Sequence, residues 1–300
     1  MKGNTSAGFL LVDKPQGWTS HDVVAKVRGQ IGGKVGHAGT LDPMATGLLV
    51  LGIGGATRLL RFVQGARKEY LATALLGVAT DSLDADGTIV SSEPLPVTAA
   101  EVREAMEQFT GEISQIPPMV SARKVDGRRL YELAREGKVV EREARKVTID
   151  KLELIDFAPS DHPEITFRTV CTTGTYIRTL ADDIGRALGG RAHLTALRRV
   201  RNGPIHVKDA LSIDEIVAAV SNDDIERLVL DPGSVLEGFP EIRVDEDLAL
   251  RVRNGRDLPS HMAPDEALVQ EFLRISDRNG NLIAMYRDDN GALVPEVVIQ

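Results

Sequence analysis

Residues Gly36 to Leu49, GHAGTLDPMATGLL, surround one carboxylate, Asp42, with residues that restrict the backbone. Pro43 fixes its own φ angle and disfavours the helical region for the residue before it. Glycines at positions 36, 39 and 47 allow conformations that other residues resist, and the apolar run Leu48 to Ile53 is long enough for a buried strand. We therefore expect Asp42 on a rigid, non-helical turn, as a candidate nucleophile or general base. The alternative is an ordinary Asp-Pro turn without a chemical role.

The composition is typical of a protein with a sizeable buried core and no disulfides. Of the 300 residues, 42% are hydrophobic, and Cys171 is the only cysteine, which excludes an internal disulfide and a multi-cysteine zinc site. No uncharged apolar stretch reaches the length of about 18 residues that a membrane-spanning helix needs. The N-terminal segment lacks the apolar core of a signal peptide. We expect a cytoplasmic protein.

Charge is distributed unevenly along the chain. The net charge is −8, but residues 209–300 hold 20 acidic and 8 basic residues, whereas residues 1–208 hold 24 acidic and 28 basic ones. Two stretches of the first part are basic. Arg123 to Lys146 has nine basic and five acidic residues, and Arg186 to Lys208 has six basic residues and no acidic one. Two such stretches favour a nucleic-acid partner over a merely solvated surface.

The spacing of apolar residues and the capping signals predict an alternation of strands and helices. Capping boxes begin at Thr19, Thr98 and Ser212. The loop Thr80 to Gly87, TDSLDADG, lacks the closing Glu of a calcium-binding EF-hand, and we expect it on the surface. The predicted strands cover residues 8–13, 48–53, 67–76, 147–157 and 165–171. The predicted helices cover residues 20–30, 56–63, 99–109, 177–188 and 213–220.

Two further regions differ from these elements in composition. The segment Pro117 to Arg145 is basic, contains glycine and is weakly apolar, so it is expected to project from the body, where it suits an RNA backbone. Residues Ile242 to Gln300 alternate short apolar runs with Gly, Asn, Asp and Pro, which predicts a small β-rich module.

Four stretches share their residues and their order with one known family. They are GFLLVDKPQGWTSHDVV from Gly8, the stretch around Asp42, GTYIR from Gly174 and AHLTALRR from Ala192. Together with a K-x-Y pattern ending at Tyr70, they resemble the TruB family of tRNA pseudouridine synthases. The resemblance covers roughly residues 8–204.

The resemblance implies roles for individual residues. Asp42 corresponds to the catalytic residue of the family, and Asp84 to an acidic position near the active site. An Arg178 guanidinium beside Asp42 is expected to orient this carboxylate and to hold its pKa down. Tyr70 and Tyr176 correspond to two tyrosines that lie at the target base. Leu197 corresponds to a leucine that lines the uracil pocket, and His37 to a histidine that enters the RNA loop and fills the vacated space. The substrate-binding residues so implied are Tyr70, Tyr176, Arg178, Leu197 and His37.

The resemblance also implies a fold and an activity. The fold is α+β, with a mixed, mostly antiparallel catalytic sheet flanked by helices in residues 1–235, a thumb at about 117–145 and a PUA-like, β-rich domain at 240–300. The activity is isomerisation of uridine to pseudouridine at position 55, in the TΨC loop of tRNA, by base flipping and without a cofactor or a metal. The expected partner is tRNA alone, with no guide RNA and no membrane, bound by a monomer.

Other functions remain as alternatives. A non-catalytic RNA-binding or tRNA-folding protein would use the same basic segments, although the presence of every implied site residue favours catalysis. A guide-dependent synthase subunit is a second alternative, and the thumb-like insert argues for action without partners. A metal- or nucleotide-dependent hydrolase is less supported, because Gly52 to Gly55 is followed by no P-loop Lys-Ser/Thr.

Overall fold

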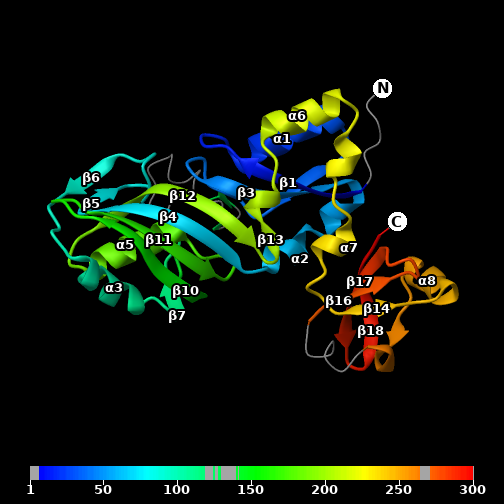
Figure 1. Cartoon of the computed structure of the whole chain (residues 1–300). Helices are drawn as coiled ribbons and strands as arrows, with labels where there is room; N and C mark the ends of the chain where they lie inside the picture. The colour runs from blue at the N-terminus through cyan, green and yellow to red at the C-terminus, as the bar shows by residue number, and fades with distance from the viewer. Residues whose placement is uncertain are drawn as a thin grey trace.

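The computed structural model describes residues 7–118, 124–125, 128–129, 140, 142–263 and 271–299, with the residues at 124–125 and 128–129 described by their backbone only. One long sheet runs through the larger part of the molecule, and a smaller sheet lies beside it near the C-terminus (Figure 1). The expected α+β fold is confirmed.

The long sheet has nine strands and is mixed but mostly antiparallel. Its order is β1-β3-β12-β4-β11-β10-β7, with β2 paired to β3 and β13 paired to β12, and the β3–β12 pair is its parallel one. The strands are β1 (Gly8–Lys14), β2 (Val35–Ala38), β3 (Thr46–Ile53), β4 (Lys68–Leu76), β7 (Gly111–Gln115), β10 (Arg145–Ala158), β11 (Glu164–Cys171), β12 (Ala192–Asn202) and β13 (Ile205–His206).

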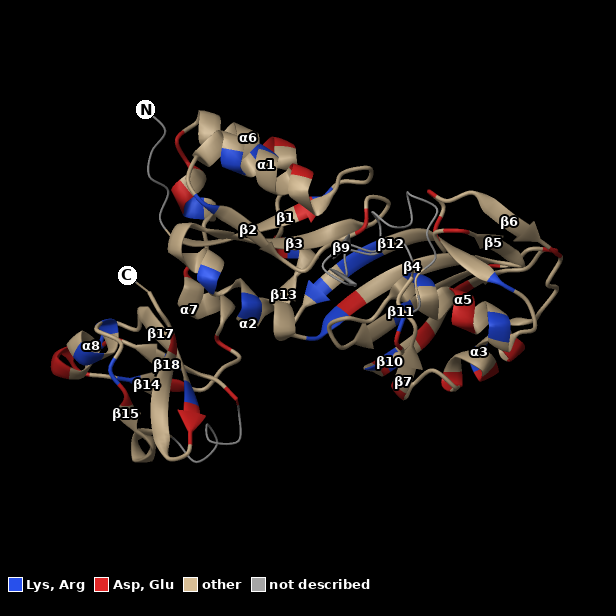
Figure 2. Cartoon of the chain, turned by 180° about the vertical axis from the view of Figure 1, so that it is seen from behind, with Lys and Arg blue, Asp and Glu red and all other residues tan. Residues whose placement is uncertain are grey.

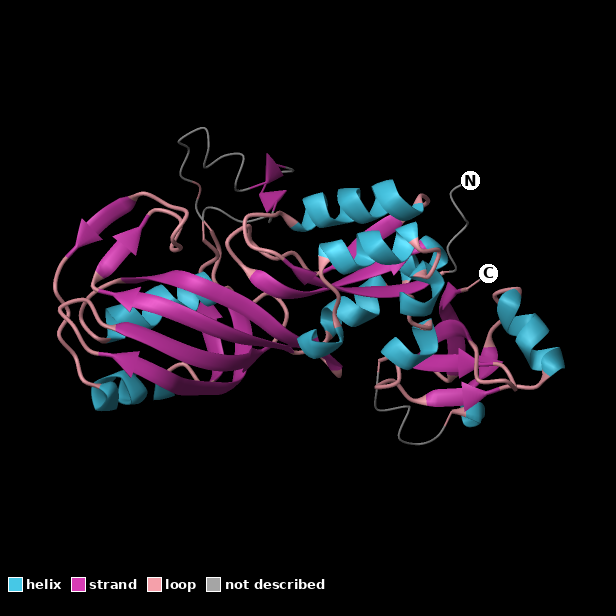
Figure 3. Ribbon diagram, turned by 45° about the horizontal axis from the view of Figure 1, so that its top comes forward, coloured by secondary structure: helices cyan, strands magenta, loops and turns pink. Residues whose placement is uncertain are grey.

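Helices cover the faces of this sheet, as the ribbon in Figure 3 shows. The α-helices of this region are α1 (Ser20–Ile31), α2 (Leu60–Gly65), α3 (Ala99–Glu107), α5 (Ile177–Ala187), α6 (Ile213–Ser221) and α7 (Pro232–Val235). The predicted capping boxes are present at the N-termini of α1, α3 and α6, where the Thr or Ser hydroxyl and the third helical residue satisfy each other's backbone N–H groups. Short 3₁₀ helices are η1 (Gly54–Arg58), η2 (Val207–Asp209) and η3 (Ile225–Leu228).

The predicted helix over residues 56–63 is wrong in its form. The chain makes the 3₁₀ helix η1 first, and α2 begins only at Leu60. Gly54 has a positive φ of 58°, and the N–H of Leu59 donates to the carbonyl of Ala56, three residues back. An i→i+3 bond of this kind belongs to the tighter 3₁₀ winding.

The two halves of the long sheet differ in how their strands are covered. In β3 every residue after Thr46 is buried, because α1 and α6 cover one face and η1 and α2 cover the other. In β4 buried and half-buried residues alternate strictly, and the buried set packs against α3 and α5. The sequence pattern of each strand therefore reports the number of faces that are covered.

Strand β12 was not predicted, although it lies at the centre of the sheet between β3 and β4. Its sequence, AHLTALRRVRN, contains three arginines and no continuous apolar run. Two of these arginines are at least partly buried, and they satisfy their charge through specific partners described below. Periodicity alone does not reveal a strand of this kind.

The C-terminal module has its own five-stranded sheet and core, as expected for a small β-rich unit. Its sheet order is β14-β16-β17-β18-β15. Phe62 of α2 meets Phe239 and Phe272 edge-on at ring-centroid distances of 6.0 and 5.0 Å, and Arg61 pairs with Glu296 at 2.7 Å. The module therefore packs directly on the larger part. Its elements are β14 (Glu241–Arg243), α8 (Glu246–Arg253), β15 (Leu258–Pro259), η4 (Ser260–Met262), β16 (Leu273–Ser276), β17 (Leu282–Asp289) and β18 (Ala292–Val298).

Two short hairpins complete the described structure. Strands β5 (Val78–Thr80) and β6 (Ile89–Ser92) frame the loop that follows β4, and β8 (Lys124–Val125) pairs with β9 (Arg128–Arg129). Most of the predicted thumb, 117–145, lies outside the described residues. Within the described residues no helix is long and apolar enough to span a membrane.

Candidate active site

Asp42 lies on a fixed turn between β2 and β3, as predicted. The N–H of Ala45 donates to the Asp42 carbonyl at 3.1 Å, and the Pro43 carbonyl accepts from the N–H of Gly17 at 2.8 Å and from Lys14 Nζ at 3.3 Å. The buried Lys14 side chain therefore ties the end of β1 to the residue that follows Asp42. Its other acceptors are the carbonyls of Pro15 and Trp18.

The glycines of this loop are required for different structural reasons. Gly39 and Gly47 have φ values of 86° and 99°, which L-residues rarely adopt. A Cβ on Gly47 would also lie 2.3 Å from the carbonyl oxygen of Arg199, so the start of β3 approaches β12 as only glycine permits. The expectation for Gly36 is wrong, because this residue is part of β2 and has no positive φ. A Cβ there would come within 3.0 Å of Leu60 Cδ1.

Arg178 binds Asp42 with two parallel contacts. Its Nε lies 3.0 Å from Oδ2 of Asp42, and its Nη2 donates to Oδ1 at 3.1 Å. The Arg178 side chain is only 3% exposed, whereas the Asp42 side chain is 35% exposed. A two-bond guanidinium–carboxylate pair fixes both position and orientation. Arg178 thus fixes the Asp42 carboxylate from its buried side, and part of the Asp42 side chain remains accessible to solvent.

Ser82 and Asp84, in the loop after β5, bind the other side of the guanidinium. Nη1 of Arg178 lies 3.2 Å from Oδ2 of Asp84 and donates to the carbonyl of Ser82 at 3.0 Å. Leu83, between them, has a φ of 62°, a rare value for a residue with a side chain. The surface position predicted for residues 80–87 is therefore wrong for Thr80, Ser82 and Asp84, which are buried, and Ser82 and Asp84 bind Arg178.

Burial raises the pKa of Asp42 above its ordinary value, the opposite of the direction expected from the sequence. Arg178 does lower the pKa, but loss of water around the carboxylate outweighs it. The nearby Asp84 carboxylate raises the pKa further, and Lys14 lowers it. A guanidinium that is shared by two carboxylates stabilises the ionised form of each less than a guanidinium that binds only one of them.

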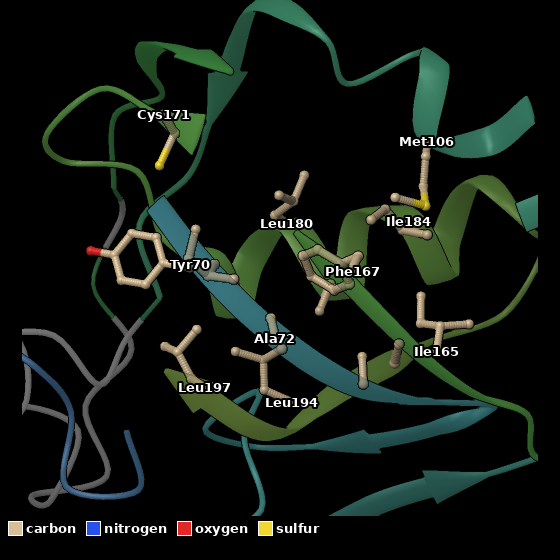
Figure 4. Packing of buried hydrophobic residues seen from close by; sticks show 14 of the residues in the cluster. Tyr70, Ala72, Met106, Ile165, Phe167, Cys171, Leu180, Ile184, Leu194 and Leu197 are labelled. Atoms are coloured by element: carbon tan, nitrogen blue, oxygen red, sulfur yellow. The ribbon is translucent and has the colours of Figure 1, made fainter. Parts of the chain in front are cut away.

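Tyr70 and Leu197 lie side by side on one face of the sheet. Tyr70 of β4 is opposite Arg199 of β12, and Ala72 is opposite Leu197, so all four side chains belong to the same face. Figure 4 shows Tyr70 and Leu197 at one end of the buried cluster, with the Tyr70 hydroxyl directed away from Phe167. Leu41, the neighbour of Asp42, belongs to this same cluster. The structure thus brings the two predicted pocket residues to the end of the core that the Asp42 loop covers.

Tyr176 is held by a residue that the sequence did not single out. Gln115, at the end of β7, accepts from the backbone N–H of Tyr176 at 3.0 Å and donates to its carbonyl at 3.3 Å. The Tyr176 side chain itself is half-buried. Because Tyr176 precedes α5 directly, the Gln115 amide fixes the start of the helix that carries Arg178. The polar Gln115 directly before Ile-Pro-Pro was the feature of the sequence that could have identified this residue.

His37 lies on β2, the strand before the Asp42 turn. It is half-buried on β2, and its ring meets that of His21 edge-on at 5.6 Å. Burial, with smaller contributions from His21 and Arg199, lowers the pKa of His37. The implied role of His37 in filling the RNA loop stays a prediction.

Three buried cations surround the loop in addition to Arg178: Lys14, Lys68 and Arg199. Burial lowers the pKa of Lys14 and of Lys68 to about 8, and Arg199 contributes to both shifts. Lys68 donates to the carbonyls of Gln64 and Ala66. Across the described ranges, no group of three or more His, Cys, Asp or Glu side chains is arranged to hold a metal ion.

Family models match the two consecutive parts of the chain that contain this site. The model of the TruB family pseudouridylate synthase N-terminal domain matches residues 26–177, about half of the chain, and the model of the tRNA pseudouridylate synthase B C-terminal domain matches residues 178–236. The first match contains Asp42 and Tyr70, and the second contains Arg178 and Leu197. The fold and the two matches thus define the chain as a pseudouridylate synthase.

Curated relatives extend the match over almost the whole chain. The chain is 44% identical over 296 residues to tRNA pseudouridine synthase B of Burkholderia lata, covering 97% of this chain and 90% of the relative. It is 43% identical over 295 residues to the Burkholderia mallei protein of the same name, covering 97% and 96%. A Syntrophotalea carbinolica protein of that name is 46% identical over 239 residues, covering 79% and 77%. The chain belongs to the TruB family.

Solved structures share the fold. The crystal structure of a Cbf5-Nop10-Gar1 complex aligns with a TM-score of 0.75 and 25% identity, covering 97% of this chain and 83% of that chain. The structure of an H/ACA RNP bound to a substrate RNA containing 2'-deoxyuridine aligns with a TM-score of 0.74 and 24% identity, covering 98% and 85%. The latter likeness concerns the fold alone.

Proposed function

We propose that this chain isomerises uridine to pseudouridine at position 55, in the TΨC loop of tRNA, with Asp42 as the catalytic residue. The observation that carries the proposal is the two-bond pairing of Asp42 with a buried Arg178, which leaves one edge of the carboxylate accessible. Family membership and the names of the relatives support tRNA as the substrate. The alternative of a non-catalytic RNA-binding protein does not account for a carboxylate held in this way.

The reaction is an internal rearrangement. The bond between N1 of the uracil and C1′ of the ribose breaks, the base turns, and C5 forms the new bond to C1′ while the C5 hydrogen is lost and a proton is gained at N1. Product and substrate have the same composition, so the reaction consumes no oxidant or reductant. Asp42 acts in its ionised form, which the Arg178 fork favours.

The base has to leave the RNA stack to reach Asp42. Extruding a nucleotide costs a few kcal/mol of stacking and pairing. In this proposal Tyr70 stacks on the extruded base, Leu197 lines its pocket, Tyr176 borders the site, and His37 fills the space left in the loop. These roles follow from the family pattern, and the common face of Tyr70 and Leu197 supports them.

The partner in this proposal is tRNA without a guide RNA. Figure 2 shows basic residues on β12 and at the start of β4, where Arg67 and Arg201 lie, whereas α8 of the C-terminal module carries both acidic and basic residues. Basic residues near the site suit a phosphate backbone. We also propose a cytoplasmic monomer, with a catalytic domain at residues 1–235 and a C-terminal domain at 240–300.

An in vitro reaction tests the proposal. Purified protein is incubated with unmodified tRNA transcript in EDTA, and pseudouridine is mapped by carbodiimide labelling and primer extension. The expected result is one stop at position 55, which disappears with a transcript carrying cytidine there and with Asp42→Asn. Binding of tRNA without product would favour the RNA-folding alternative, and product only after addition of a guide RNA would favour the guide-dependent one.

A further inference from the structure

Among the residues that the structure describes, Arg199 is the largest completely buried side chain, with 1% of its surface exposed. It lies in the middle of β12, where its Cα partners are Tyr70 on β4 and Gly47 on β3. One neighbour is therefore the tyrosine of the proposed pocket, and the other is the second residue of β3, the strand that follows the turn carrying Asp42. Arg199 therefore lies between Tyr70 and the strand that follows the Asp42 turn.

The guanidinium of Arg199 joins the two arms of the Asp42 loop. Its Nε donates to the carbonyl of Leu48 at 2.7 Å, and its Nη2 donates to the carbonyl of Gly39 at 3.0 Å. Gly39 lies three residues before Asp42, and Leu48 lies six residues after it. A single planar group thus sets the separation of the two arms. The rigid fork geometry of arginine suits this role, and a lysine cannot reproduce it.

The same residue lies directly opposite Tyr70 across the β4–β12 pair. The charge of Arg199 lowers the pKa of Tyr70 against the larger opposing effect of burial. The group that holds the loop therefore also lies beside Tyr70. Any displacement of Arg199 moves the ring and the Asp42 turn relative to each other.

Arg199 has no carboxylate partner within ion-pair distance among the residues that the structure describes. A buried charge without a counter-ion is costly, and apolar residues of similar volume commonly stabilise a core better. The adjacent Arg198 provides the contrast, because it points to the other face and forms a two-bond pair with Asp13 at 2.6 and 3.0 Å. Stability alone gives no reason to keep Arg199.

We propose that Arg199 is a positioning residue, which fixes the Tyr70 ring and the Asp42 loop in one geometry for the reaction. The proposal rests on the proposed function, since it concerns the same site. It predicts that Arg199 acts on the chemical step and not on the affinity for tRNA. Misplacement of reacting groups by about 1 Å is enough to lower a rate by about a hundredfold.

Single-turnover kinetics test this proposal in Arg199→Lys, with Arg198→Lys as the matched control. We expect Arg199→Lys to lower the rate of pseudouridine formation by about a hundredfold, with a tRNA dissociation constant close to that of the parent protein. Arg198→Lys is expected to change neither by more than a few fold. Equal effects of the two substitutions, or a loss confined to tRNA affinity, would overturn the proposal. An inactive parent protein would instead refute the proposed function.

A double-mutant cycle with Tyr70→Phe separates positioning from a general loss of structure. If Arg199 acts in part through the Tyr70 hydroxyl, Arg199→Lys has a clearly smaller effect in the Tyr70→Phe background, by about fivefold or more. Additive effects would contradict the shared role. If the Lys variant does not fold, Arg199→Gln, which keeps an amide donor without a buried charge, replaces it in the same cycle.

Discussion

Helix α5 carries two ion clusters of opposite composition, one turn apart. At its start, Arg178 contacts two carboxylates, Asp42 and Asp84. Four residues later, Asp182 contacts two guanidinium groups: Arg186 at 2.9 Å, and Arg191 at 2.6 and 3.1 Å. In the first cluster the central residue is a cation and in the second it is an anion, and both central residues are buried.

The clusters differ in what they leave accessible. In the Asp182 cluster the carboxylate is 5% exposed, both of its oxygens are occupied by arginines, and the backbone N–H of Ala192 also donates to it. The exposed groups are guanidinium groups, which have no reactivity. In the Arg178 cluster the accessible group is the Asp42 carboxylate. The comparison separates a cluster that ties α5 to β12 from one that presents an accessible carboxylate.

Helix electrostatics support this distinction. A cation in the first turn of a helix is unfavourable, because the helix N-terminus carries a partial positive charge. Arg178 is the second residue of α5. Its position is therefore explained by its partners outside the helix and not by the stability of the helix itself.

The largest effect among the surrounding residues is expected for Arg178→Lys. A lysine retains the charge but cannot bind both oxygens of Asp42 while also reaching Asp84 and Ser82. We expect the single-turnover rate to fall by about a hundredfold or more, measured as tritium release from tRNA labelled at C5 of uridine. Arg186→Lys, in the second cluster, serves as the control. A rate close to that of the parent protein would argue against the pairing.

Asp182→Asn is expected to affect stability instead of the reaction. The substitution removes the charge that two arginines share, so the free energy of unfolding should fall. Because both arginines can become hydrated, the decrease should be limited to about 2 kcal/mol. Urea unfolding measures the change. The rate on tRNA at a temperature where the variant is folded should stay within a few fold. A rate loss as large as that of Arg178→Lys would remove the distinction between the clusters.

Asp84→Asn sharpens the account of how the two carboxylates share Arg178. In the proposed reaction the ionised Asp42 is the active form, so the rate should fall as the pH decreases through its raised pKa. Removing the Asp84 charge lowers the pKa of Asp42, which should move this acidic limb to lower pH. The dependence of the single-turnover rate on pH measures the shift. A limb that stays in place or moves to higher pH would contradict the shared site.

The smallest effect concerns Asp183, beside the second cluster. Burial, reinforced by Asp182, raises the pKa of Asp183 to about 6. The folded protein therefore binds this proton more tightly than the unfolded chain, and the associated stability is lost as the pH rises through 6. Because the carboxylate keeps contact with water, we expect Asp183→Asn to stabilise the protein by only about 1 kcal/mol at pH 8, and by much less at pH 4. Equal effects at both pH values would contradict the pKa shift.

The sequence predicted the parts of the fold that local patterns determine. The capping boxes at Thr19, Thr98 and Ser212 located three helices, and Asp42 lies on the non-helical turn that Pro43 requires. Strand β12 was missed because its arginines are satisfied by partners far away in the chain. Had it been recognised as a strand, the alternation of side chains would have placed Arg199 on the same face as Leu197.

The site residues that were missed act through long-range contacts. Gln115 meets Tyr176 across 61 positions, and Ser82 meets Arg178 across 96. The direction of the pKa shift of Asp42 was also missed, because it depends on how much water the folded chain excludes, and not on the presence of one guanidinium. Residue types identify the chemistry of a pair, whereas its surroundings follow only from the fold.

The most direct test compares Asp42→Asn with Asp182→Asn in two measurements on the same preparations. For Asp42→Asn we expect tritium release to fall by about ten-thousandfold or more, with tRNA binding and the free energy of unfolding nearly unchanged, because Arg178 keeps Asp84 and Ser82. For Asp182→Asn we expect the reverse pattern. Full activity of Asp42→Asn, on a transcript that the parent protein modifies at position 55, would contradict the central claim that the accessible carboxylate of the Arg178 cluster performs the reaction.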